Sequence, residues 1–306
     1  MTILLFFQGD HISMNKKPTA KDVAKAAGVS VATVSYVLNN KEGQKISEET
    51  RKKVLQMANL LHYIPSHEAK SLATGKNNMI GITYHVREDS PSRNLEIMHL
   101  VNLMVERFSR MNYSTIIIPF DQESADMAPN RMLDGIIAID IPEEDFKRMA
   151  DKYYVPIICA DMIVNDFLFY QVYTDMQALG KEASKCLGDD FYFLTDAYDN
   201  KKYLDYICSI VPQNRVIVMN SFDKKALKRL KGKKLLVNGA YLALSISQFV
   251  DLKDVAVISY RTEHVELKDC AMIIHNDVAK KANLTMNIML NAFEQKFDIT
   301  HDFKIS

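Results

Sequence analysis

The chain has 306 residues, of which 48% are hydrophobic and 25% charged, an ordinary soluble composition that argues against a membrane protein and leaves room for two or three packed units. The formal net charge is zero, but residues 14–76 carry eleven Lys/Arg against five Asp/Glu, a net charge of plus six. Positive charge is therefore concentrated in a part of the chain that could contact phosphates.

Four cysteines stand far apart in the sequence with no paired spacing. They fit neither a zinc site nor a disulfide framework, so we expect reduced, buried thiols, a cytoplasmic protein and no cofactor. The residues concerned are Cys159, Cys186, Cys208 and Cys270.

Residues 1–13 have an apolar stretch, but they lack the basic start and the small-residue cleavage pattern of a signal peptide. They are also too short to span a bilayer. We expect an extra segment outside the fold, with the first domain opening at Met14.

The stretch that begins at Thr19 predicts two short helices joined by a glycine turn. Thr19 and Asp22 have the spacing of a capping box, and the first helix runs to about Ala27. Gly28 supplies the left-handed conformation for the helix exit, and Ser30 caps the second helix. A turn this short is typical of a helix-turn-helix.

Helical spacing separates the residues of this pair into an inward and an outward set. The inward set closes the helix crossing and consists of Val23, Ala24, Ala27, Val29, Val34, Val37 and Leu38. The outward set on the second helix is small or hydroxylic, which suits a helix end in the major groove, and consists of Val31, Ala32, Thr33, Ser35 and Tyr36. An ordinary helical hairpin is the alternative.

A third helix follows, capped by Ser47, with an inward face of Val54, Met57, Ala58 and Leu61. Pro65 then interrupts regular structure. Beyond it, Ala69 and Leu72 have helical spacing in a segment with too little apolar surface to be stable alone.

The run from Asp22 to Asn39 resembles the DNA-binding domain of the lactose/galactose repressor (LacI) family. The match continues through Thr50-Arg51, Ala58, Tyr63-x-Pro65 and Ala69-Lys-Ser-Leu72. The resemblance implies an α/β protein with an N-terminal three-helix helix-turn-helix DNA-binding domain at 14–64 and a hinge helix at 65–76. After them it implies a two-lobed periplasmic-binding-protein-like core at 77–306.

The motif and the resemblance together predict which residues contact double-stranded operator DNA. Many members of the family carry arginine where this chain has Tyr36, so the base preference there should differ. A leucine at the place of Leu72 wedges into the minor groove in the family, although a plain linker residue is the alternative. The predicted contacts are Thr19, Ala20, Lys21, Ser30, Val31, Ala32, Thr33, Ser35, Tyr36, Asn39, Lys45, Ser47, Thr50, Ser66, Ala69 and Leu72.

From Met79 onward, apolar strand segments alternate with helical ones, which indicates parallel sheets. The segments form two successive series, and two series imply two lobes. We expect lobe 1 at about 77–173 and 272–295, and lobe 2 at about 174–271 and 296–306.

The helix expected at 95–111 carries an apolar stripe that is either core or partly a subunit contact. The stripe consists of Met98, Val101, Met104, Val105 and Phe108. One small DNA-binding domain can contact only one half of a two-fold symmetric operator. A second copy is needed for the other half, so we expect a homodimer.

The sequence contains no catalytic or metal-binding pattern, and we expect no enzyme activity. The acidic group Asp140, Glu143, Glu144 and Asp145 is interpreted as a helix start with solvated charges rather than as paired catalytic carboxylates.

The core departs from the acidic and arginine pattern with which sugar-binding relatives hold hydroxyl groups. The nearest candidates for an effector site are Asp175, Lys202, Asn238 and Arg261. Asp175 is equally well interpreted as a helix N-cap. We expect that a small-molecule effector, if one binds, is anionic.

An aromatic group in the second series could stack on a ligand, but buried packing is the stronger interpretation. It consists of Phe191, Tyr192, Phe193, Tyr198, Tyr203 and Tyr206.

The chain is thus expected to be a dimeric DNA-binding transcriptional regulator, most simply a repressor. In the main alternative, the degenerate core serves only dimerisation or protein partners. A freestanding solute-binding protein is a further alternative, but such a protein would not need the predicted DNA-binding domain.

Overall fold

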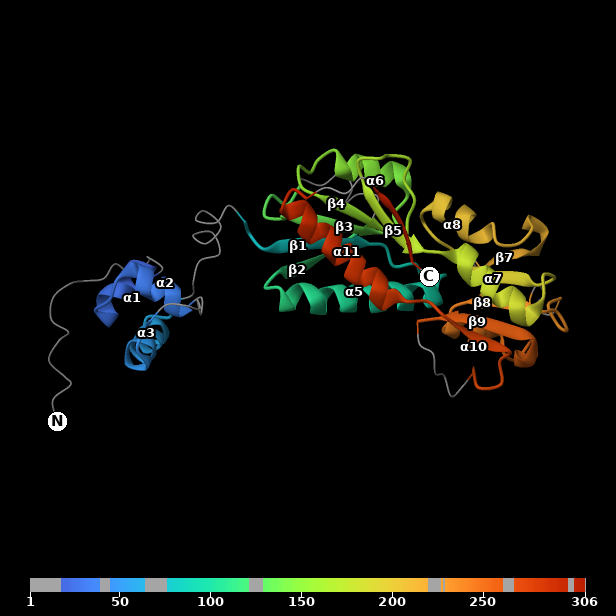
Figure 1. Cartoon of the computed structure of the whole chain (residues 1–306), viewed down its shortest axis with the longest axis horizontal. Helices are drawn as coiled ribbons and strands as arrows, with labels where there is room; N and C mark the ends of the chain where they lie inside the picture. The colour runs from blue at the N-terminus through green and yellow to red at the C-terminus, as the bar shows by residue number, and fades with distance from the viewer. Residues whose placement is uncertain are drawn as a thin grey trace. The chain divides into compact units, whose positions relative to one another are not determined.

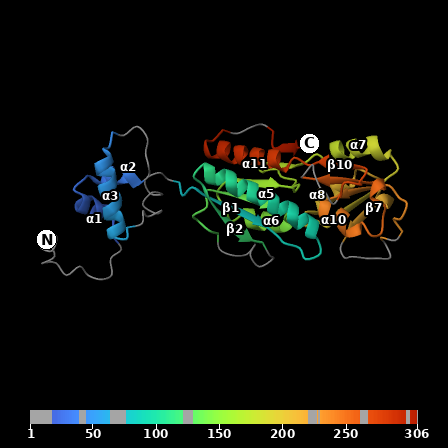
Figure 2. The ribbon, with the colours of Figure 1, turned by 90° about the horizontal axis from the view of Figure 1, so that it is seen from below.

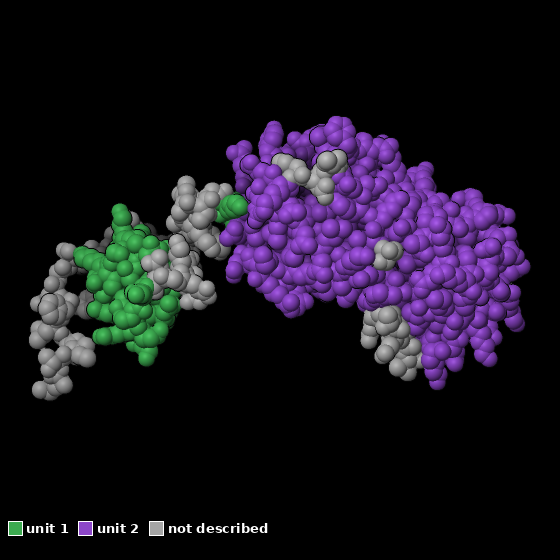
Figure 3. Space-filling model, viewed as in Figure 1, with its two compact units in different colours: residues 1–77 green, residues 78–306 purple. Residues whose placement is uncertain are grey.

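The computed structural model describes residues 18–38, 45–63, 76–120, 129–219, 227, 229–260, 267–296 and 300–305. It forms two compact units, residues 1–77 and 78–306 (Figure 3). Except for Lys76, the predicted hinge segment lies outside the described residues.

The first unit contains the three predicted helices, α1 (Ala20–Ala27), α2 (Val31–Leu38) and α3 (Glu48–Leu60). The Thr19 N–H donates to the Asp22 carboxylate at 2.8 Å, and Gly28 has a φ of 70° that ends α1. The expected inward faces of the helices are confirmed, because they form one small core. Its fully buried members are Val23, Ala24, Ala27, Val34, Val37, Val54 and Ala58.

The second unit has two parallel sheets (Figure 1). The first sheet is covered on one face by α5 (Pro91–Arg110) and α11 (Val278–Phe293), and on the other by α6 (Glu143–Ala150). Figure 2 shows α5 and α11 running together along this lobe. In spatial order its strands are β11 (Asp302–Ile305), β5 (Tyr170–Thr174), β4 (Ile157–Ala160), β3 (Gly135–Ile139), β1 (Met79–Tyr84) and β2 (Ser114–Pro119).

The second sheet has α7 (Met176–Leu187) and α8 (Lys201–Cys208) on one face and α10 (Ala240–Ile246) on the other. Alternate residues of each strand enter two separate cores, as in a parallel sheet covered on both faces. Its strands, in order, are β10 (Met272–His275), β9 (Val255–Ser259), β8 (Leu235–Asn238), β6 (Tyr192–Asp196) and β7 (Val216–Met219).

The expected assignment of the last segments to the lobes was wrong for the two strands, although α11 packs in the first lobe as expected. β10 pairs with β9 in the second sheet, with Ile274 in its core, whereas β11 pairs with β5 in the first sheet. Strands of four residues carry too little pattern to reveal their sheet. Thr174 and Asn276 lie where the chain passes between the lobes, and their side chains are hydrogen-bonded at 3.1 Å.

The apolar stripe of α5 is mostly core. Val101, Met104 and Phe108 are buried in the first lobe, whereas Met98 is 42% exposed. None of the described helices has both the length and the hydropathy to cross a bilayer.

The four cysteines are free thiols. Cys159 and Cys208 are buried as expected, and Cys270 is half-buried. Cys186 is exposed at the end of α7, so the expectation of burial was wrong there.

Candidate functional site

We call the helix-turn-helix domain, residues 14–64, the head. Its second helix, α2, exposes its first turn to solvent. Ser30 caps α2 by accepting the Thr33 N–H at 3.0 Å, so its side chain has a structural partner. Val31 and Ala32 follow and are exposed, while Val34 and Val37 point into the core. The exposed N-terminal turn can approach base edges, since no side chain of its own core covers it.

The structure describes twelve of the sixteen predicted DNA contacts. Ser47 also caps a helix, because it accepts the Thr50 N–H at 3.2 Å. Of these predicted contacts, the exposed residues are Thr19, Lys21, Ser30, Val31, Ala32, Ser35, Lys45 and Ser47, and the half-buried residues are Ala20, Thr33, Tyr36 and Thr50. Asn39, Ser66, Ala69 and Leu72 lie outside the described residues.

A second candidate site lies between the two lobes of the core, where strands of both sheets end. Asp140 follows β3 and Asp161 follows β4, and these strands are neighbours in register. Both aspartates have left-handed backbones, with φ of 53° and 49°, a conformation that Asp tolerates better than most residues. Their carboxylates consequently meet at one edge of the sheet.

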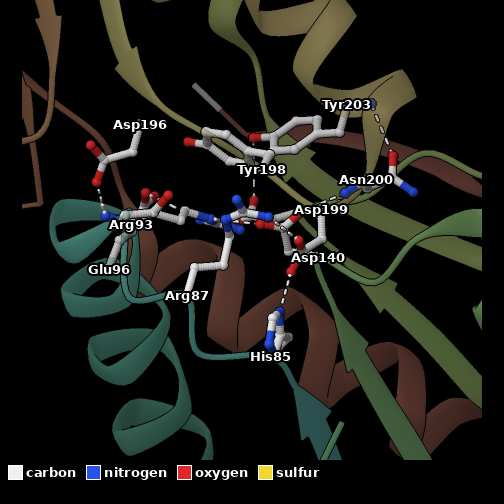
Figure 4. A network of polar contacts seen from close by, with 12 residues as sticks. His85, Arg87, Arg93, Glu96, Asp140, Asp196, Tyr198, Asp199, Asn200 and Tyr203 are labelled. Atoms are coloured by element: carbon white, nitrogen blue, oxygen red, sulfur yellow. Dashed lines mark hydrogen bonds and ion pairs between the residues drawn. The ribbon is translucent and has the colours of Figure 1, made fainter. Parts of the chain in front are cut away.

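Two buried cations from helices neutralise these carboxylates. Arg93, in the first turn of α5, donates from Nε to Asp140 and from Nη1 to Asp161, each at 3.1 Å (Figure 4). Lys281 of α11 lies 2.6 Å from Asp161, and Glu96 lies 3.2 Å from Arg93. We call Arg93, Glu96, Asp140, Asp161 and Lys281 the interlobe ion cluster.

Sequence reasoning placed Asp140 among solvated charges, and that interpretation was wrong. Asp140 is only 3% exposed and pairs with Arg93, while Glu143, Glu144 and Asp145 do open α6 as predicted. The other four members of the cluster were missed. For Asp161, the position of a carboxylate directly after an apolar strand run was the available signal.

Burial and charge act in opposite directions in this cluster. Burial raises the pKa of Asp140 to about 7 although Arg93 opposes the shift. Burial also favours a higher pKa at Asp161, but the nearby cations Lys281 and Arg93 hold this pKa below its usual value. Two cations face three carboxylates, so a proton on Asp140 would balance the charge.

The second lobe closes on the cluster with the segment from Asp196 to Tyr203. Asp196 accepts the Arg93 backbone N–H at 2.9 Å, and the Asn200 N–H donates to Asp140 at 3.0 Å. The Arg93 guanidinium lies 4.4 Å from the ring centroid of Tyr198. Direct hydrogen bonds and a cation–π contact thus join the lobes.

The aromatic group of the second lobe is mainly packing, as expected. Phe191, Phe193, Tyr198 and Tyr203 are buried in its core. Tyr203 also reaches the cluster, with its hydroxyl 3.4 Å from Asp161.

The predicted effector residues do not form one site. Asp175 caps α7 by accepting the Ala178 N–H at 3.1 Å, and Lys202 is paired with Glu143. Asn238 lines a cavity of about 190 Å³ between α5 and the ends of β8 and β9. Arg261 lies outside the described residues. Within the described residues, no group of three or more His, Cys, Asp or Glu could hold a metal ion.

The raised pKa of Asp140 predicts a pH-dependent stability contribution. The carboxyl is protonated more readily in the folded than in the unfolded chain, so its contribution falls as pH rises from about 4 to about 7. The free energy of unfolding of the wild type, minus that of Asp140→Asn, should fall by at most roughly 1.4 kcal/mol per pH unit in this window.

Urea unfolding at several pH values would measure this difference. His99 acts in the opposite direction because burial lowers its pKa, but it is present in both proteins and cancels. A difference that stays constant across the window would contradict the assignment.

Comparison with known protein sequences finds matches to the helix-turn-helix head. Residues 19–66 match the family model "Bacterial regulatory proteins, lacI family". The HTH-type transcriptional repressor PurR of Mannheimia succiniciproducens is 30% identical over 151 residues, covering 47% of this chain and 43% of that protein. The probable HTH-type transcriptional repressor ExuR of Bacillus subtilis is 48% identical over 66 residues, or 22% of this chain and 19% of that protein. This chain thus spans less than half of either relative.

Solved structures are similar over nearly the whole chain. The lac repressor dimer bound to operator and the anti-inducer ONPF has a TM-score of 0.67 at 19% identity, covering 95% of this chain and 96% of that one. The complex of the transcriptional regulator CelR with cellobiose has a TM-score of 0.57 at 13% identity, with 94% and 97% covered. The predicted architecture, a helix-turn-helix head followed by a two-lobed α/β core, is confirmed.

Proposed function

We propose that this chain, whose residues 19–66 carry the helix-turn-helix of the lacI family, is a sequence-specific DNA-binding transcriptional regulator acting as a repressor. The family match confirms the resemblance found in the sequence. The observation that carries the proposal is the capped α2, whose first turn is exposed on a basic head.

Selection from random duplexes with the full-length protein tests this function. An inverted repeat should be enriched, because two heads related by a two-fold axis contact two half-sites. Val31 is 42% exposed, so Val31→Glu should abolish enrichment without unfolding the head. Leu55, 43% exposed on α3 and not a predicted DNA contact, gives a matched control in Leu55→Glu. Enrichment of asymmetric single sites, or none, would count against the proposal.

Homodimerisation is the second part of the proposal. α5 and α10 pack against each other and expose a set of large apolar side chains from both lobes. We propose that a second copy covers this face, since a palindromic operator needs two heads. The set consists of Leu95, Met98, Tyr241 and Leu244.

A charge on this face should separate the subunits. Leu244→Glu would bury an uncompensated carboxylate, which costs about 3 to 5 kcal/mol and raises the dimer dissociation constant by at least about 100-fold. Sedimentation velocity over a range of concentrations measures the change. Met132 is also 42% exposed but lies in the turn before β3, so Met132→Glu should leave the dimer unchanged.

Effector control would act through the cavity between the lobes. Of the three described candidates, only Asn238 lines the cavity between the lobes. The Asn238 amide donates to Tyr198 Oη at 2.9 Å and to Thr195 Oγ1 at 3.1 Å. A core that serves dimerisation alone therefore stays an alternative, and the interlobe ion cluster favours it.

A further inference from the structure

The interlobe ion cluster occupies the place in the fold where open α/β sheets hold ligands. Such ligands bind in the crevice beyond the carboxyl ends of the strands. Here Asp140 and Asp161 follow two strands of the first lobe, and both accept from the Arg93 guanidinium. Asp196 ends β6 of the second lobe and accepts from the Arg93 backbone N–H. The guanidinium thus lies between carboxylates of the first lobe and the Tyr198 ring of the second lobe, as a bound cation would.

We propose that Arg93 is a tethered occupant of the interlobe cleft, which holds the two lobes together without a small-molecule effector. The inference concerns the regulation of the proposed DNA-binding function and rests on it for its biological meaning. The contacts of Arg93 lie within the core and do not depend on DNA binding.

Burial is the first observation that supports the proposal. The Arg93 side chain is 2% exposed and the Lys281 side chain is not exposed at all. Charges are buried this deeply only when partners compensate their lost hydration. Asp140, Asp161 and Glu96 supply that compensation for Arg93, so the cluster needs no further cation. The buried Nη2 of Arg93 has no hydrogen-bond partner among the described residues.

Close approach of the lobes is the second observation. Ser92, next to Arg93, lies against Gly239 in the turn from β8 to α10. A Cβ built at Gly239 would come 2.0 Å from Ser92 Oγ, and the φ of 118° at this position also requires glycine. The first turn of α5 thus packs directly against the second lobe, and no side chain fits between them at this position.

The remaining space is the third observation. The cavity beside the cluster has a volume of about 190 Å³, below the roughly 300 Å³ at which drug-sized ligand pockets begin. Glu96, on its wall, is already engaged by Asn276 at 2.7 Å and by Arg93 at 3.2 Å. A disaccharide would not fit without separation of the lobes.

Chemical rescue tests the proposal in the full-length protein. Arg93→Ala removes the occupant and leaves Asp140 without its cationic partner, whereas Asp161 keeps Lys281. The melting temperature of the core should fall by roughly 6 to 20 °C, as expected for loss of one partner of a buried ion pair. Ethylguanidine, which replaces the missing planar cation, should restore part of this loss and leave the wild type unchanged.

Controls separate the tethered occupant from a merely structural arginine. Urea, planar but uncharged, and ethylamine, charged but not planar, should rescue Arg93→Ala much less than ethylguanidine. Arg87 also bridges the lobes, to Asp199 at 2.6 Å, but its side chain is 27% exposed. Arg87→Ala should therefore melt within a few degrees of the wild type and show no rescue.

The outcomes are decisive even if the variant does not fold alone, because the refolding yield of Arg93→Ala in ethylguanidine then becomes the readout. Absence of rescue by ethylguanidine would overturn the proposal. So would a neutral or phosphorylated sugar that raises the melting temperature of the wild type and loses this effect in Asn238→Ala. Since melting does not require DNA, the proposal and the proposed function can fail separately.

Discussion

The affinity for the selected inverted repeat should fall by about three to five decades between 50 and 200 mM salt. The head and hinge segment, residues 14–76, have a net charge of plus six per chain, so two copies could neutralise roughly six to ten phosphates. Each neutralised phosphate releases a counterion, and this release makes the affinity depend on salt.

Single lysines allow a sharper form of this experiment. Lys21 and Lys45 are exposed in the head, and replacing either with Gln should weaken binding to all sequences and reduce the salt slope by about one for each phosphate that is no longer neutralised. Lys233 is exposed in the core, so Lys233→Gln serves as the matched control. Fluorescence anisotropy at several salt concentrations gives the slopes. A slope near zero, or equal losses in all three variants, would exclude phosphate contacts at Lys21 and Lys45.

Local signals were sufficient to predict the head. Capping residues, a left-handed glycine and helical spacing act within one turn of the chain, and the structure confirms them at Asp22, Gly28, Ser30 and Ser47. α7 begins after Asp175 for the same reason, since Asp175 caps it, as one of the two interpretations of this residue predicted. Patterns of this kind do not depend on distant contacts.

The interlobe ion cluster could not be predicted in this way because its members are far apart in the sequence. Arg93 and Glu96 have the spacing of an ordinary surface pair on a helix, and nothing within α11 distinguishes Lys281 from Lys280. Only the packing of α5 and α11 across the strand ends buries their charges. The lobes of β10 and β11 were assigned wrongly for a related reason, since sheet pairing is also a long-range property.

Loss of Asp161 should destabilise the core more than loss of any surface acid. Asp161 is fully buried and accepts from both Arg93 and Lys281, so Asp161→Ala leaves two buried cations without this partner. Breaking a buried pair typically costs about 3 to 5 kcal/mol. Urea unfolding of the core should show a loss of this size. Glu106 pairs with Arg110 at the surface, and Glu106→Ala should cost less than about 1 kcal/mol.

A double-variant cycle distinguishes the ion pair from general damage to packing. Lys281→Met removes one of the stranded cations and keeps a side chain of similar length. The double variant Asp161→Ala with Lys281→Met should therefore lose less stability than the two single losses added together, with a coupling of about 0.5 to 3 kcal/mol. Strict additivity would mean that Asp161 and Lys281 do not stabilise one another. The contact between β4 and α11 in the first lobe would then depend on packing rather than on this ion pair.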